Sequence, residues 1–242
     1  MVMNTVFYGR ERQRRIRAFL LKFPYAPTSI LQKVFFPTQK AGKRKARSVL
    51  ADMAGEQELI KRFKHGEYVY YVGKKSTQWR HMHDVTMFHF DIFFRLKRSN
   101  DIIYKNDTFF SLKQPQEIVF MKREFEYPGG RADALYIIKL KEDGSGVKFF
   151  LEWDDGENEF DKIPKYEAYA NSRVWTKEYW ADPLKTGHYS FPQVLIVSYR
   201  DINIKSDVLT VKLCEPGDNY LEVLIGDKEV STDRQNGYGR LK

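Results

Sequence analysis

Two apolar runs on either side of one strong turn signal most constrain the fold of this chain. Residues 132–140 are rich in Ile, Tyr and Leu, and residues 147–153 are similarly apolar. Between them stands EDGSG at residues 142–146, a composition typical of chain reversals. The pattern predicts an antiparallel β-hairpin. Because residues 132–140 place apolar side chains on both faces, we expect this strand to be covered on both sides.

Three carboxylates fall near the open end of the predicted hairpin. With a turn centred near residue 144, Asp133 should lie opposite residues near 154–156. Glu152 and Asp154 are two residues apart, so their side chains share one face of a strand. Three close carboxylates need a cation or a basic neighbour, or else have raised pKa values. Because oxygen ligands favour Mg²⁺ or Mn²⁺ over Zn²⁺, Asp133, Glu152 and Asp154 are candidate ligands of such a cation.

A lysine-bearing helix is predicted after the acidic loop. The segment DKIPKYEAYANSRVW should be helical from about Pro164, which suits a first helical position. Lys162 and Lys165, with Tyr166 and Tyr169, are the side chains expected to approach the acids. A lysine there would orient an attacking water or stabilise charge on a phosphate. The sequence leaves open which lysine does so, and a purely structural acidic loop is the alternative.

The remaining segments of this half predict further strands. Residues 118–126 precede the hairpin as one strand, and residues 191–198 form a continuous apolar run. Such a run predicts a buried central strand, parallel to a neighbour. Residues 208–213 (VLTVKL) and 220–226 (YLEVLIG) predict two more strands that extend the sheet or cover its edge.

Positive charge is concentrated in the first third of the chain. Residues 1–78 hold 17 of the 41 Lys and Arg residues but 5 of the 32 Asp and Glu residues, so the rest of the chain is slightly acidic. This asymmetry predicts a basic binding module joined to a nearly neutral domain. A polyanion, first of all double-stranded DNA, is the expected partner. A solvated basic surface without a partner is the alternative.

The basic third has the pattern of a winged helix-turn-helix. Helices are predicted at residues 10–22, 29–36 and 39–54, followed by a two-stranded ribbon at residues 59–63 and 68–72. The start of the third helix would enter the major groove, and the ribbon would lie along the DNA backbone. The candidate DNA-binding residues are Lys40, Lys43, Arg44 and Arg47 on the helix and Lys61, Arg62 and Lys64 on the ribbon. A winged helix used for protein contact is the alternative.

A polar linker at residues 73–77 suggests the domain division. We expect a winged-helix domain over residues 1–75 and a second domain over residues 76–242. The second would open with an apolar helix at residues 79–97, buried against the sheet or, in a homodimer, against a second copy. The single cysteine, Cys214, cannot form an internal disulfide. No apolar run approaches the roughly 20 residues of a membrane span. We therefore expect a cytoplasmic protein without membrane contact.

The arrangement of these segments resembles a known class of proteins. A strand with an acid, a hairpin to E-x-D, a helix with lysine and a later buried strand look like the PD-(D/E)XK nuclease-like superfamily. More narrowly, the chain over about residues 8–200 resembles the replication-relaxation family of plasmid and mobile-element proteins. The matching segments are RHMHDV, GGRADALYI, FFLEWDDGENEF, KIPKYEAY and FPQVLIVS. The resemblance implies an N-terminal winged helix and a restriction-endonuclease-like α/β domain with a mixed central sheet.

The resemblance also implies roles for single residues. Asp133 takes the place of the first metal acid, and Glu152 that of the acid in the E-x-K element. Asp154 stands where a lysine is usual, which departs from the superfamily pattern. Lys162 would then supply the missing charge from the helix. The implied catalytic set is Asp133, Glu152, Asp154 and Lys162, with Mg²⁺ or Mn²⁺ as the cofactor.

Three functions remain open at this level. The first is a DNA-binding protein of plasmid or phage replication, relaxation or mobilisation, which acts with replication or mobilisation proteins and nicks DNA by Mg²⁺-assisted hydrolysis. The second is a non-catalytic transcriptional regulator or replication accessory whose second domain serves dimerisation or partner binding. The third, an RNA-processing nuclease, ranks last because a winged helix more often serves duplex DNA.

Overall fold

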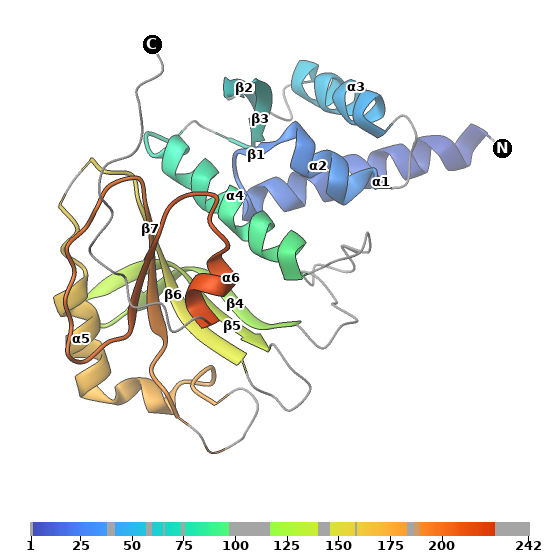
Figure 1. Cartoon of the computed structure of the whole chain (residues 1–242). Coiled ribbons are helices and arrows are strands. Elements are labelled where there is room, and N and C mark those ends of the chain that lie inside the picture. Colours follow the sequence, from blue (N-terminus) through green and yellow to red (C-terminus); the bar gives the residue numbers. More distant parts are fainter. Residues whose placement is uncertain are drawn as a thin grey trace, which may run out of the picture. The chain divides into compact units, whose positions relative to one another are not determined.

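The computed structural model of the chain contains two compact units, Met1–Gln114 and Pro115–Lys242. It describes residues 2–37, 42–56, 60–64, 66–73, 76–96, 117–139, 146–157, 159–182, 187 and 189–225. The predicted turn residues 142–145 and linker residues 74 and 75 lie outside these ranges. The two units together form a mixed α/β protein, as expected (Figure 1). None of the helices so described is long and apolar enough to cross a membrane.

The first unit combines helices with a small antiparallel sheet. Its first three helices are α1 (Val2–Lys22), α2 (Thr28–Phe35) and α3 (Gly42–Gly55). Its strands are β1 (Ala26–Pro27), β2 (Ile60–Lys64) and β3 (Glu67–Tyr71), in the order β1-β3-β2. The predicted order of three helices followed by a two-stranded ribbon is therefore confirmed, although α1 begins earlier than expected.

Helix α4 (Trp79–Leu96) belongs to the first unit. The ring of Phe90 lies 5.5 Å from that of Phe19 on α1 and 5.2 Å from that of Phe23. Nδ1 of His83 donates a hydrogen bond to the carbonyl oxygen of Tyr25 at 2.8 Å. The apolar stripe of α4 is thus completed by α1 and the turn after it. For this reason the chain divides at residues 114 and 115, whereas the polar composition of residues 73–77 suggested a division before the helix.

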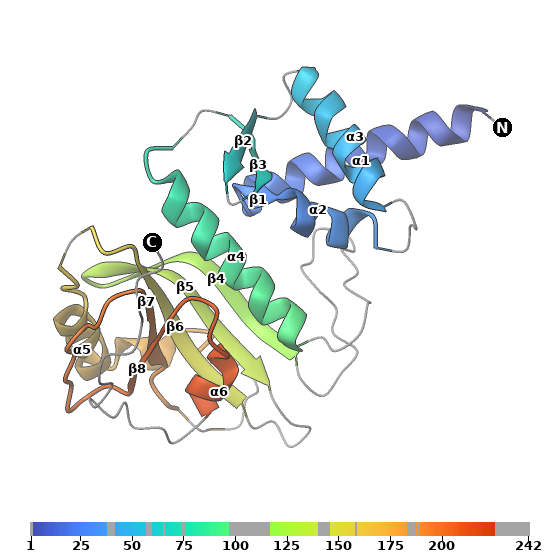
Figure 2. The same cartoon turned by 45° about the horizontal axis from the view of Figure 1, so that its top comes forward.

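The second unit is built on a five-stranded mixed sheet. Its strands are β4 (Glu117–Tyr127), β5 (Gly130–Lys139), β6 (Gly146–Asp154), β7 (Gln193–Ser198) and β8 (Val211–Cys214), in that order across the sheet. The pairs β4–β5 and β5–β6 are antiparallel, and β6–β7 and β7–β8 are parallel. The predicted mixed sheet with a buried parallel strand is confirmed. The helices are α5 (Ile163–Ser172), the 3₁₀ helix η1 (Val174–Lys177) and α6 (Tyr220–Ile225). In Figures 1 and 2, α5 and α6 lie to either side of β7.

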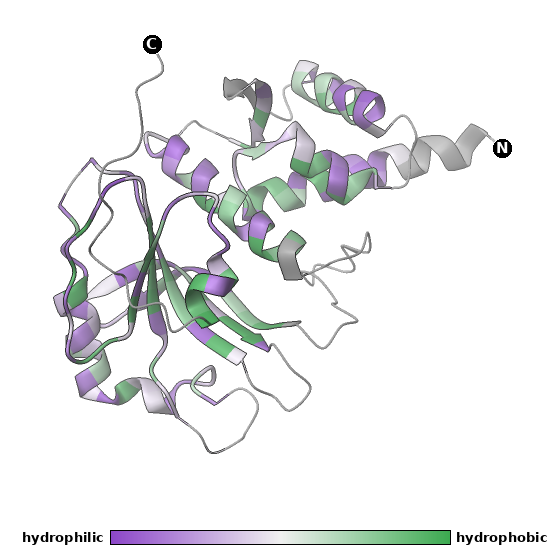
Figure 3. Cartoon of the chain, viewed as in Figure 1, coloured by the Kyte–Doolittle hydropathy of each residue, from purple (hydrophilic) through white to green (hydrophobic). Residues whose placement is uncertain are grey.

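An aromatic core joins α5 to the sheet. The ring of Phe150 on β6 lies 5.0 Å from that of Tyr166 on α5, and Trp180 packs edge-on against Phe125 at 5.8 Å. Residues 132–138 of β5 are all buried. Because successive side chains point to opposite faces of a strand, both faces of β5 are covered, as expected. Figure 3 accordingly shows central strands that are mostly hydrophobic.

Two predictions of local structure are wrong. Residues 220–225 form helix α6 and not a strand, because the buried residues Tyr220 and Leu224 follow helical spacing. The hairpin register also differs from the prediction. Its last pair is Lys139 with Gly146, so the reversal is centred before residue 144. A Cβ at Gly146 would lie 2.1 Å from the carbonyl oxygen of Ile138, so the strands can pair this far only with glycine there.

Candidate functional site

Asp133 and Glu152 lie side by side on neighbouring strands. Because Ala134 pairs with Leu151, the next step along the antiparallel pair brings Asp133 opposite Glu152. Both side chains are buried, with 8% of Asp133 and 1% of Glu152 exposed. The backbone N–H of Trp153 donates to Oδ2 of Asp133 at 2.7 Å. The hairpin therefore brings these two predicted acids together in spite of its different register.

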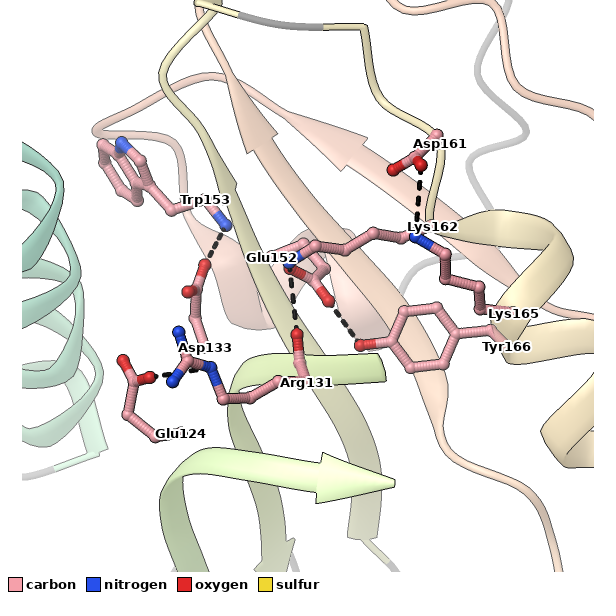
Figure 4. A network of polar contacts seen from close by, with 9 residues as sticks. All are labelled: Glu124, Arg131, Asp133, Glu152, Trp153, Asp161, Lys162, Lys165 and Tyr166. Atoms are coloured by element: carbon pink, nitrogen blue, oxygen red, sulfur yellow. Dashed lines mark hydrogen bonds and ion pairs between the residues drawn. The ribbon is translucent and has the colours of Figure 1, made fainter. Parts of the chain in front are cut away.

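Two side chains from the start of α5 hold the carboxylate of Glu152 (Figure 4). The hydroxyl of Tyr166 donates to Oε1 of Glu152 at 2.5 Å. The ammonium of Lys162 forms an ion pair with Oε2 and also donates to the carbonyl oxygen of Arg131 at 3.2 Å. Of the two predicted lysines, Lys162 is thus the one in contact with the acids. Lys165 instead pairs with Asp161 at the surface, 3.1 Å away.

The local sequence explains this pair of contacts. Pro164 stands in the first turn of α5, so the helix begins directly after Lys162. Residues four apart lie on the same face of a helix, so Tyr166 follows Lys162 toward the sheet. One helical turn therefore supplies one donor for each oxygen of Glu152.

Burial and unequal charge shift the pKa values of this cluster. Burial, and next the charge of Asp133, raise the pKa of Glu152 to about 7, although Lys162 and Tyr166 favour its ionised form. Burial works against the charged form of Lys162, but attraction to Glu152 and Asp133 outweighs it and raises its pKa. Burial and the charge of Glu152 raise the pKa of Tyr166 far above its ordinary value. Glu152 is therefore in contact with Lys162 and lies beside a second acid, and its pKa is about 7.

Asp154, the third predicted acid, has different partners. Arg200 forms a two-pronged contact with it, from Nε to Oδ2 at 2.8 Å and from Nη2 to Oδ1 at 2.9 Å. The hydroxyl of Ser198 donates to Oδ2 at 2.7 Å. Burial favours the neutral form of Asp154, but these hydrogen bonds outweigh it and lower its pKa. Asp154 is therefore a charge-paired acid.

Sequence reasoning missed Arg200 and Ser198. They follow from the parallel pairing of β6 with β7, which sets Asp154 opposite Ser198 at the carboxyl ends of the two strands. A usable signal was present, since the apolar run that predicts β7 ends at Ser198 and Arg200 follows two residues later. Arg123 on β4, which is half-buried, was missed as well. Burial lowers its pKa, and the charge of Asp133 is among those that oppose this shift.

Asp133 and Glu152 fit a divalent-cation site of two protein carboxylates. Mg²⁺ is often bound by one or two carboxylates, with water and substrate phosphate completing its shell. Burial, and after it the charge of Asp133, raise the pKa of Glu152, and a cation bound between the two acids would offset their mutual repulsion. Across the described ranges, no group of three or more His, Cys, Asp and Glu side chains is placed to hold a metal ion. The fit therefore depends on these two acids.

A second candidate site is the exposed face of α3. Lys43, Arg44 and Arg47 are exposed, while Leu50 and Met53 are buried. Figure 3 shows hydrophilic residues at the start of this helix. The helix is therefore amphipathic, with its cations directed away from the core of the unit.

The structure does not describe the side chains of the other predicted DNA-binding residues. Lys40 lies outside the described residues. The backbone of Lys61, Arg62 and Lys64 forms β2, and their side chains lie outside the description. Lys45, which was not in the predicted set, is a further exposed cation on α3.

Searches of protein-family models, curated proteins and solved structures find no match to this chain.

Proposed function

We propose that this protein binds double-stranded DNA in plasmid or phage replication, relaxation or mobilisation, and that its second unit nicks DNA with Mg²⁺. The supporting observation is the cluster of Asp133, Glu152 and Lys162, drawn from β5, β6 and the start of α5. Two acids and a lysine are what the resemblance to the PD-(D/E)XK superfamily implies, with the lysine moved from strand to helix. The first unit would correspond to the N-terminal winged helix that the resemblance also implies.

Each group has a distinct chemical task in this proposal. Asp133 and Glu152 would hold the cation, which when bound polarises a phosphate and lowers the pKa of its water. Lys162 stays protonated beside these acids and would stabilise negative charge on the scissile phosphate. The exposed cations of α3 would contact the DNA duplex and hold the second unit near it.

Plasmid nicking tests the catalytic part. Supercoiled plasmid is incubated with Mg²⁺ or Mn²⁺ and with wild-type protein, Asp133→Asn, Glu152→Gln or Lys162→Met. We expect nicking by the wild type and its loss in all three variants. Lys165→Met is the matched control and should nick normally, because Lys165 pairs with Asp161. A protein that shifts DNA but never cuts it with either metal would refute the catalytic part.

DNA binding is tested separately by salt titration. Arg44→Ala with Arg47→Ala should weaken binding to duplex DNA and flatten its dependence on salt, because two phosphate-facing cations are lost. Lys205→Ala removes an exposed cation from the second unit and is the control. Unchanged affinity in the double variant would contradict the groove assignment of α3.

A non-catalytic regulator is the second candidate, and one observation favours it. The third acid, Asp154, is already balanced by Arg200 and Ser198, so it is not available as a further ligand in this arrangement. A second unit that serves partner binding would tolerate this pairing. The same nicking experiment separates the two candidates, because a regulator would bind DNA and leave the plasmid supercoiled.

A further inference from the structure

Tyr166, which is not one of the predicted catalytic or metal-binding residues, donates a buried hydrogen bond to Glu152. Glu152 is 1% exposed and Tyr166 is 0% exposed, so water does not compete for their hydrogen bond. Tyr166 donates to one carboxylate oxygen and Lys162 pairs with the other. With a different donor on each oxygen, the carboxylate cannot rotate without breaking a buried contact.

Tyr166 is itself held in place by the ring of Tyr127. The two rings stack with their centroids 4.6 Å apart, and Phe150 packs against Tyr166 at 5.0 Å. Tyr127 in turn lies over Gly130, where a Cβ would come within 2.6 Å of its hydroxyl oxygen. The position of the Tyr166 hydroxyl is thus set by the turn between β4 and β5, the same turn that leads to Asp133.

We infer that Tyr166 is a positioning residue of the candidate metal centre, which holds Oε1 of Glu152 so that Oε2 faces the cation together with Asp133. This inference rests on the proposed function. Tyr166 is wholly buried on the side of Oε1, so a cation would approach Oε2 and replace the Lys162 ammonium there. The ring is wholly buried, so Tyr166 acts through Glu152 and does not touch the substrate.

Tyr169 offers a matched control. It lies on the same helix, is buried and stacks on the same Tyr127 ring at 5.4 Å. The pKa of Tyr169 is raised to about 12 by burial and by Glu178 rather than by Glu152. Tyr166→Phe and Tyr169→Phe therefore each remove one hydroxyl from the same aromatic stack, but only the first removes a donor to Glu152.

Manganese binding by the full chain tests the inference. Free Mn²⁺ is measured by its electron paramagnetic resonance signal during titration of wild-type protein, Tyr166→Phe, Tyr169→Phe and Glu152→Gln. Groups that orient metal ligands typically change affinity by about 10- to 100-fold. We expect Tyr166→Phe to bind Mn²⁺ about tenfold more weakly and Tyr169→Phe to bind as the wild type does. Equal affinity of Tyr166→Phe and wild type, or equal weakening in both tyrosine variants, would overturn the inference.

The Mn²⁺ affinity of Glu152→Gln and the carboxyl ¹³C resonance of Glu152 distinguish a failure of the metal centre from a failure of the positioning role. If wild type and Glu152→Gln bind Mn²⁺ equally, the metal centre of the proposed function is refuted and the inference falls with it. If only Glu152→Gln binds weakly, the metal centre stands and the positioning role alone is refuted. The carboxyl ¹³C resonance of Glu152, recorded without metal, checks the contact itself. It should move in Tyr166→Phe and stay in place in Tyr169→Phe, and the reverse pattern would also overturn the inference.

Discussion

Glu152 and Asp154 stand two residues apart on β6, yet their surroundings shift their pKa values in opposite directions. The pKa of Glu152 is raised to about 7 by burial and by Asp133, whereas that of Asp154 is lowered by its hydrogen bonds. Glu152 is in contact with Lys162 and lies beside Asp133 in the interior. Asp154 is in direct two-pronged contact with the guanidinium of Arg200, whose side chain is 39% exposed. Burial beside a second acid therefore distinguishes Glu152, where a divalent cation would relieve repulsion, from Asp154, whose charge already has a direct two-pronged partner.

The largest expected effect is on the pH dependence of stability at Glu152. Its pKa rises from 4.5 to about 7 on folding, so the stability that its proton contributes is lost as pH increases through this range. In EDTA, we expect the free energy of unfolding of the wild type to fall by about 3 kcal/mol between pH 5 and pH 8 because of this group. Glu152→Gln should lack that fall. Urea unfolding of both proteins at the two pH values measures it, and identical pH dependence would contradict the charge state assigned here.

Removal of Lys162 should have the next largest effect. Lys162→Met leaves Glu152 beside Asp133 without its ion-pair partner, which we expect to cost about 2 kcal/mol of stability at pH 8, a value reduced because the lysine side chain is 34% exposed. The cost should shrink at pH 5, where Glu152 is protonated. Urea unfolding at both pH values provides the measurement. Lys165→Met is the control and should leave stability unchanged, and equal losses in both variants would remove the distinction between the two lysines.

Local sequence signals predicted most of the elements. Continuous apolar runs such as residues 191–198 and amphipathic repeats such as that of α3 each fit one regular structure. The segment of α6 was ambiguous, because YLEVLI is short and nearly all apolar and so fits either period. The packing partner of α4 could not be predicted from its apolar stripe. Such a stripe shows that a helix is buried but does not identify the element that covers it.

The candidate site was predictable where the contacts were local. A hairpin brings Asp133 near Glu152 even when its register is misjudged by a few residues, and helical spacing carries Tyr166 with Lys162. The partner of Asp154 was not predictable in this way. Arg200 is 46 residues away along the chain and arrives through the parallel pairing of β6 and β7. Long-range strand pairing is what a single sequence specifies least.

The smallest expected effect, and the sharpest contrast with Glu152, comes from Asp154. Because its pKa is lowered on folding, Asp154 contributes stability above its ordinary pKa of 3.8, and this is lost as pH falls through the folded value. Asp154→Asn should therefore cost about 1 kcal/mol at pH 7, a modest value because Arg200 is partly exposed. The cost should vanish as pH falls below 4. Urea unfolding of the variant and the wild type across this range measures it.

The two acids thus predict opposite trends from one strand. As pH rises from acid to neutral, the wild type should gain stability relative to Asp154→Asn and lose stability relative to Glu152→Gln. Both substitutions exchange a carboxylate for an amide of similar size, so a difference in packing cannot produce opposite signs. If the two curves bend the same way, Lys162 neutralises Glu152 as fully as Arg200 neutralises Asp154, and the electrostatic reason for a cation beside Asp133 disappears.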